Sequence, residues 1–130
     1  MDIRVEEIQA YIDFRDKYNV PIYMGESGEN NDEWVRDFRE LLDEHEINWA
    51  FWPYKKMNNT RGFMNFDQPE EYQQIIDFAE GDRSTFEAIR TRRPKREVSI
   101  EALKKFNRNS LFQNSYPNAG YIDALGFGEN

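Results

Sequence analysis

Residues 21–30 read PIYMGESGEN and residues 49–56 read WAFWPYKK, and these two stretches decide the predicted fold. Each begins as an apolar β-strand and ends in side chains that can do chemistry. A helix between them is predicted by an apolar stripe at helical spacing, which consists of Trp34, Val35, Phe38, Leu41 and Leu42. A crossover of this length joins parallel strands. Such a unit, with functional residues at both carboxyl ends, is typical of a (β/α)8 barrel.

The first strand and the start of the helix carry more detailed signals. The run from Val20 to Gly25 is almost continuously apolar, which predicts a strand covered on both faces. The form Asn-x-x-Glu from Asn30 to Glu33 is close to a capping box, so the helix is expected to begin there with Glu33 as a capping residue.

The rest of the chain is predicted to be mostly helical. Apolar spacing and stop signals indicate helices at residues 5–18, 69–80, 84–89 and 99–107. Residues 55–68 are expected to form a polar loop. The tail from Asn109 is polar, with four side chains that could pack down: Tyr121, Ile122, Leu125 and Phe127. No domain boundary is indicated, so residues 1–130 are expected to form a single segment.

Composition limits the classes of function. The 130 residues include ten Phe, seven Tyr and three Trp, enough aromatic surface for a core. The net charge of −8 disfavours nucleic-acid binding, and no apolar run is long enough to span a membrane. The absence of cysteine excludes disulfides and thiolate metal sites. Charged residues begin at Asp2, so no signal peptide is indicated and localisation stays open.

Glu26 is the main candidate for catalysis. It stands where a parallel strand ends, between Gly25 and Gly28, which keep side-chain bulk away from it. A carboxylate in this place can attack the anomeric carbon of a sugar and form a covalent intermediate. A surface glutamate in a glycine turn explains the same pattern equally well.

Aromatic and polar residues at the second strand end are candidates for substrate binding. The indole of Trp52 could stack on the apolar face of a pyranose ring, although strand tryptophans more often belong to a core. Tyr54 and Lys55 follow it and could hydrogen-bond sugar hydroxyls, or could be ordinary loop residues. Trp49 is expected to be a core residue.

Together these motifs resemble glycoside hydrolase family 5, the cellulase family. The resemblance rests on Gly25-Glu26-x-Gly28 after an apolar strand and on Trp49-x-x-Trp52 one helix later, and it covers residues 1 to about 110. It implies an α/β fold that is part of a TIM (β/α)8 barrel. The chain would hold the sixth helix, the last two βα units and C-terminal helices, and would lack the N-terminal strands.

The resemblance also implies roles for the candidate residues. Glu26 is similar to the catalytic nucleophile at the end of strand seven, and Trp52 to the aromatic platform beneath the sugar. The implied reaction is retaining hydrolysis of β-1,4 bonds in β-glucan, with neither metal nor cofactor. Two residues depart from the family pattern, since Ser27 replaces an aromatic residue and Asn48 a common glycine.

A second carboxyl group is missing from the predicted site. A retaining glycosidase needs an acid/base about 5 Å from its nucleophile. In the resembled family this residue lies on strand four, which the chain lacks. Glu29 and Glu33 are nearby carboxylates, expected to be a solvated loop residue and a helix cap. The chain is therefore expected to carry the nucleophile without the acid/base.

Other features carry weaker hypotheses. His45 is the only histidine, and no converging metal ligands are indicated. The basic run at residues 90–96 is interpreted as a solvated turn. Two parallel strands with open edges are not a stable sheet, so self-association or complementation by an N-terminal barrel fragment is expected. A non-catalytic carbohydrate-binding fragment and a small assembly module remain alternatives.

Overall fold

The computed structural model describes residues 3–28, 30–58 and 61–128, which form two compact units. Unit 1 comprises Met1–Asn65 with Pro117–Asn130, and unit 2 comprises Phe66–Tyr116. Within the described ranges, no helix is both long enough and apolar enough to cross a membrane.

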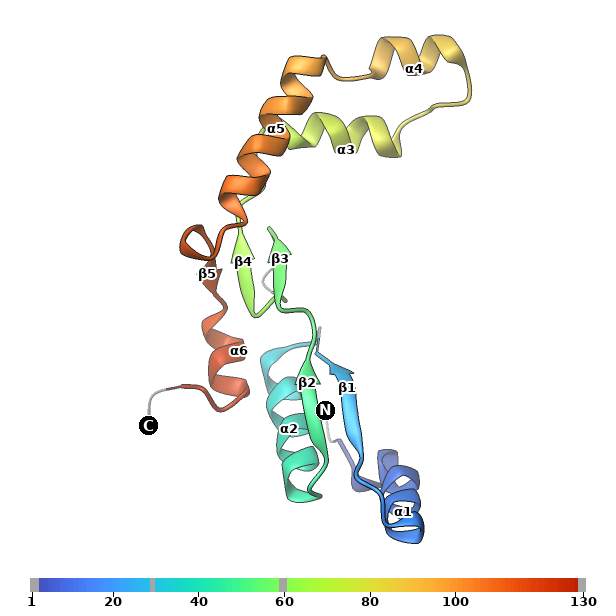
Figure 1. The fold of residues 1–130 in the computed structure, drawn as a ribbon, viewed down its shortest axis with the longest axis vertical. Coiled ribbons are helices and arrows are strands. Elements are labelled where there is room, and N and C mark those ends of the chain that lie inside the picture. Colours follow the sequence, from blue (N-terminus) through green and yellow to red (C-terminus); the bar gives the residue numbers. More distant parts are fainter. Residues whose placement is uncertain (1–2, 29, 59–60, 129–130) are drawn as a thin grey trace. The chain divides into compact units, whose positions relative to one another are not determined.

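Unit 1 is built on the predicted strand–helix–strand crossover. Strand β1 (Tyr23–Ser27) is followed by helix α2 (Asp32–Glu44) and strand β2 (Asn48–Phe51), and the two strands pair in parallel (Figure 1). The pairing is irregular between Met24 and Ser27, where β1 departs from a regular register. The predicted parallel pairing is thus confirmed, while the partial barrel remains an untested expectation.

Helix α2 begins one residue later than predicted. Its N-cap is Asn31, whose side chain accepts a hydrogen bond from the backbone N–H of Trp34 at 2.8 Å. The predicted cap at Asn30 was therefore wrong. Because Trp34 occupies the third helical position, Glu33 stands one residue short of the place from which a capping-box glutamate reaches back.

A first core cluster joins the two N-terminal helices to the sheet. The 3₁₀ turn η1 (Val5–Glu7) leads into helix α1 (Gln9–Tyr18), which ends as predicted at Asn19 in a left-handed conformation. Buried residues from these elements and the α2–β2 segment form the cluster: Ile8, Ile12, Leu42 and Ile47.

A second core cluster fixes the C-terminal helix α6 (Ala119–Ala124) against α2. Its buried members are Val35, Tyr121, Ala124 and Leu125. The hydroxyl of Tyr121 also donates to the backbone carbonyl of Asn30, and burial raises the pKa of this phenol. Packing of the tail is confirmed for Tyr121 and Leu125, whereas Phe127 is 63% exposed.

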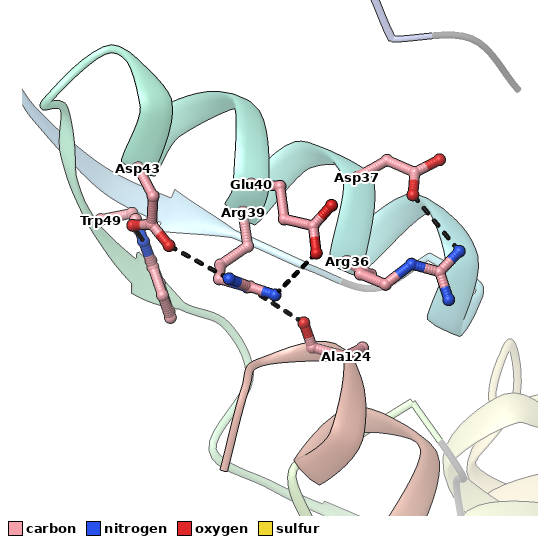
Figure 2. A network of polar contacts seen from close by, with 7 residues as sticks. All are labelled: Arg36, Asp37, Arg39, Glu40, Asp43, Trp49 and Ala124. Carbon is pink, nitrogen blue, oxygen red and sulfur yellow. Dashed lines mark hydrogen bonds and ion pairs between the residues drawn. The ribbon is translucent and has the colours of Figure 1, made fainter. Parts of the chain in front are cut away.

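Polar contacts strengthen the same helix pair (Figure 2). Arg39 on α2 donates from Nε to the carbonyl of Ala124 at 3.2 Å, at the carboxyl end of α6. The same guanidinium pairs with Asp43 at 3.3 Å, and Asp43 accepts from the indole N–H of Trp49 at 2.8 Å. A cation at the carboxyl end of a helix interacts favourably with its dipole.

Strand β1 is more open than predicted. Met24 packs on the first core cluster, but Tyr23 is 64% exposed, so coverage on both faces was wrong. The reason is the small sheet, because in the described residues β1 has a single strand neighbour, β2.

The predicted polar loop at residues 55–68 contains two short strands instead. Strands β3 (Lys55–Met57) and β4 (Met64–Phe66) form a sheet in the order β3-β4-β5 with β5 (Tyr116–Pro117). The loop prediction failed because three-residue strands carry too little alternation to be seen. Backbone bonds from Phe63 to Pro53 at 3.1 Å and from Met64 to Tyr54 at 2.8 Å hold this segment in unit 1.

Unit 2 contains helices α3 (Tyr72–Glu80), α4 (Phe86–Arg92) and α5 (Arg96–Asn109), followed by the 3₁₀ turn η2 (Phe112–Asn114). The short helix predicted at residues 84–89 is present as α4, but its cap lies one residue later than Ser84, because Thr85 accepts from the N–H of Ala88 at 3.1 Å. Helix α5 begins before Ser99, the predicted start. The ring of Phe106 lies 5.3 Å from that of Tyr72, and Lys105 forms an ion pair with Glu71 between α5 and the segment before α3.

Candidate active site

The carboxyl ends of β1 and β2 are joined by hydrogen bonds. The backbone N–H of Trp52 donates to the carbonyl of Ser27, and the Ser27 hydroxyl donates to the carbonyl of Ala50 at 3.2 Å. Ser27 therefore has a positioning contact here. These bonds hold Ser27, the last residue of β1, beside the end of β2 and beside Trp52, which follows β2.

Gly28 allows the two strand ends to approach closely. Its φ of +135° belongs to a region that is essentially restricted to glycine. A Cβ at this position would lie 2.1 Å from the backbone oxygen of Trp52 and 2.7 Å from a ring carbon of Phe51. The turn after Glu26 can therefore reach the backbone of Trp52 only because residue 28 has no side chain.

Glu26 and Trp52 line the same pocket. Its volume is about 350 Å³, and its wall consists of Met24, Glu26, Ser27, Gly28, Trp34, Phe38 and Trp52. Trp52 is 56% exposed, so its indole is a surface feature and the core alternative does not describe it. The structure thus brings together the two residues that the sequence singled out at the strand ends.

One wall of the pocket comes from helix α2. The rings of Trp34 and Phe38 stack with centroids 4.7 Å apart and an interplanar angle of 27°. Both side chains were predicted to belong to the core stripe of the helix. The sequence held a signal for this role of Trp34. The residue lies in the first turn of α2, shortly after the carboxyl end of β1, and in (β/α)8 barrels active sites are built at this end of each βα unit.

The remaining predicted residues lie outside this pocket. Tyr54 lines a separate apolar pocket of about 230 Å³ together with Trp49, Phe51, Phe63, Leu125 and Phe127. Lys55 lies in β3, with its Nζ 5.7 Å from the centre of the Tyr54 ring. The structure therefore does not bring Tyr54 and Lys55 next to Glu26. Their contacts with sugar hydroxyls remain predictions.

Among the described lining residues of this pocket, Glu26 is the only one with a carboxylate. Glu33 is an exposed residue of α2 outside the lining, and Glu29 lies outside the described residues. The arrangement offers an exposed carboxylate, three aromatic rings and space for a small ring. It can position a sugar and present one oxygen nucleophile to it.

Comparison with known proteins gives a short local likeness to endoglucanases. A 60-residue stretch is 35% identical to Endoglucanase C of Acetivibrio thermocellus and to Endoglucanase C307 of Clostridium sp. (strain F1). The match covers 41% of this chain and only 18% of each relative. No protein-family model and no solved structure matches the chain.

Proposed function

We propose that this chain is the C-terminal part of a retaining endo-β-1,4-glucanase of the cellulase type. Glu26 is the nucleophile and Trp52 the platform for the sugar beside the scissile bond. The proposal rests above all on the shared pocket of these two residues at the carboxyl ends of parallel strands. The local likeness to endoglucanases supports the same class of substrate.

The proposed chemistry begins at the solvent-exposed carboxylate of Glu26. A carboxylate oxygen of Glu26 attacks the anomeric carbon as the glycosidic C–O bond breaks, which leaves a glycosyl ester on the enzyme. Water then displaces the ester and releases the sugar with retained configuration. The three rings of the pocket match the apolar faces of glucose units, and binding to them excludes water from the reacting bond.

The proposed acid/base is not among the described lining residues of the pocket. The leaving oxygen needs a proton from a carboxyl group about 5 Å from the nucleophile, and the same group later activates water. Because the described lining of the pocket holds Glu26 as its one carboxylate, we infer that the missing part of a barrel or a second copy supplies this group. Each strand of the small sheet pairs with one neighbour in the described residues, which leaves an edge for such a partner.

The same observation favours a second candidate function, carbohydrate binding without turnover. A pocket with one carboxylate and aromatic walls is sufficient to hold a glucan chain. In this case Trp52 carries the binding energy and Glu26 contributes only hydrogen bonds to sugar hydroxyls.

Reducing-sugar release from soluble β-glucan tests the proposal. It is measured over a dilution series of the chain, alone and with an N-terminal barrel fragment of an endoglucanase. The variant Glu26→Gln removes the nucleophile with little change in shape. The matched control Glu33→Gln removes an exposed carboxylate of α2 that lies outside the pocket.

We expect turnover in the complemented sample, abolished by Glu26→Gln and preserved in Glu33→Gln. Glucan binding without turnover in any sample, weakened by Trp52→Ala but not by Tyr23→Ala, would select the binding function. Equal turnover in both glutamate variants would refute the role of Glu26.

A further inference from the structure

Unit 2 contains a pocket whose charged wall is entirely basic. It has a volume of about 520 Å³ and lies where α4 ends and α5 begins. Its lining residues are Arg90, Arg93, Pro94, Lys95, Arg96 and Ser99. Four cationic side chains in one pocket are unexpected in a chain with a net charge of −8.

These four cations have no carboxylate partners in the described part of the chain. The described ion pairs lie on α1, on α2 and between Lys105 and Glu71, and none involves Arg90, Arg93, Lys95 or Arg96. The only acidic residue in the first turn of α5, Glu97, is not part of the pocket wall. Mutual repulsion of unpaired cations is relieved when an anion binds between them.

The local backbone explains why the cations converge. Helix α4 ends at Arg92, and the chain turns through Pro94 before α5 begins at Arg96. Arg90 therefore comes from the last turn of one helix and Arg96 from the first residue of the next, and Lys95 stands between them at the N-cap. Ser99 lies one turn further along α5 in the same wall, where its hydroxyl donates to the backbone carbonyl of Lys95 at 3.3 Å.

We propose that this pocket binds a small oxyanion, a phosphate or sulfate group carried by a small molecule. Arginine matches such groups because its planar guanidinium donates two parallel hydrogen bonds to two oxygens. The pocket holds three guanidiniums and one ammonium, which carry more donors than a single carboxylate can accept. The site lies in unit 2 and is independent of the proposed glucanase activity in unit 1.

A small oxyanion fits better than a nucleic acid. The basic residues gather at one turn of a chain that is otherwise acidic, whereas a nucleic-acid surface needs cations spread along a backbone. A long polyanion would also meet the acidic remainder of the protein and be repelled by it.

The test is a titration of the full chain with inorganic phosphate, pyrophosphate and sulfate, at ionic strength held constant with chloride. Binding is followed by the backbone amide NMR signals of Arg96 and Ser99. The variant Arg93→Ala/Arg96→Ala removes two cations from the pocket. The control Lys104→Ala/Arg108→Ala removes two cations from elsewhere on α5, so both variants carry the same net charge.

We expect saturable shifts with phosphate or pyrophosphate and a dissociation constant weakened about tenfold or more in the pocket variant, with little change in the control. Circular dichroism verifies that both variants keep their helices. Absence of saturation, or equal weakening in the two variants, would overturn the site. Binding of a short RNA but of none of the small anions would overturn the choice of ligand.

Discussion

Replacement of Gly28 by alanine should separate the two strand ends that form the candidate active site. A Cβ at this position would lie 2.1 Å from the backbone oxygen of Trp52, an overlap that no side-chain rotation relieves. The φ of +135° adds strain for any residue with a Cβ. Either the turn or the Trp52 backbone must move, and both hold the pocket together.

The expected loss of stability follows from these two effects. An alanine in this region of φ costs about 1–3 kcal/mol. Overpacking against a neighbour that can yield only by a backbone shift costs about 1–3 kcal/mol more. Gly28→Ala should therefore lower the free energy of unfolding by about 2–6 kcal/mol, a large part of the 5–15 kcal/mol that is typical of a domain.

Urea unfolding followed by tryptophan fluorescence measures this change. All three tryptophans, at positions 34, 49 and 52, belong to unit 1, so the signal reports that unit. Gly25→Ala is the matched control, because its Cβ would meet only the Tyr23 ring at an ordinary 3.8 Å. We expect a change within about 0.5 kcal/mol for the control. Equal unfolding midpoints for the two variants would refute the close-approach argument.

Two further predictions concern hydrogen-bonded contacts in each unit. Tyr121→Phe keeps the buried ring but removes the bond to the Asn30 carbonyl, and should lower the unfolding free energy of unit 1 by about 1 kcal/mol in the same assay; an unchanged midpoint would contradict it. In unit 2, the hydrogen bond between Glu71 and Lys105 lowers the pKa of the carboxyl and raises that of the ammonium. The stabilisation from Glu71 is thus complete above its ordinary pKa of 4.5 and is lost as pH falls through its lowered folded-state pKa. The stabilisation from Lys105 is complete below its ordinary pKa of 10.5 and is lost as pH rises through its raised folded-state pKa. Glu71→Gln should flatten both limbs of the stability–pH curve measured by circular dichroism, and two limbs as steep as in the parent chain would refute the pairing.

The sequence predicted those parts of the fold that depend on local signals. The apolar stripe of α2 and the helix stop at Asn19 depend on residues close in sequence, and the structure contains both. Parallel pairing of β1 with β2 follows from the length of the crossover. The strands β3, β4 and β5 were not predictable, because their stability comes from pairing between residues far apart in sequence and not from a local pattern.

The candidate site was predictable for its strand-end residues and not for its helical wall. Glu26 and Trp52 stand out because of the glycines and the strand ends beside them, and they line one pocket. Trp34 and Phe38 follow the same helical spacing as the core, and spacing alone does not distinguish a core face from a pocket wall. Tyr54 was grouped with Trp52 by proximity in sequence, but it lines another pocket.

The wide separation of α2 and α6 along the chain has a consequence for synthesis. Tyr121 and Leu125 pack around Val35, yet they are made long after α2 has left the ribosome. Until then the nascent chain exposes an apolar strip of α2, which is open to chaperones or to wrong partners. Premature termination before residue 119 would leave that strip uncovered permanently, so quality control should recognise such products by this surface.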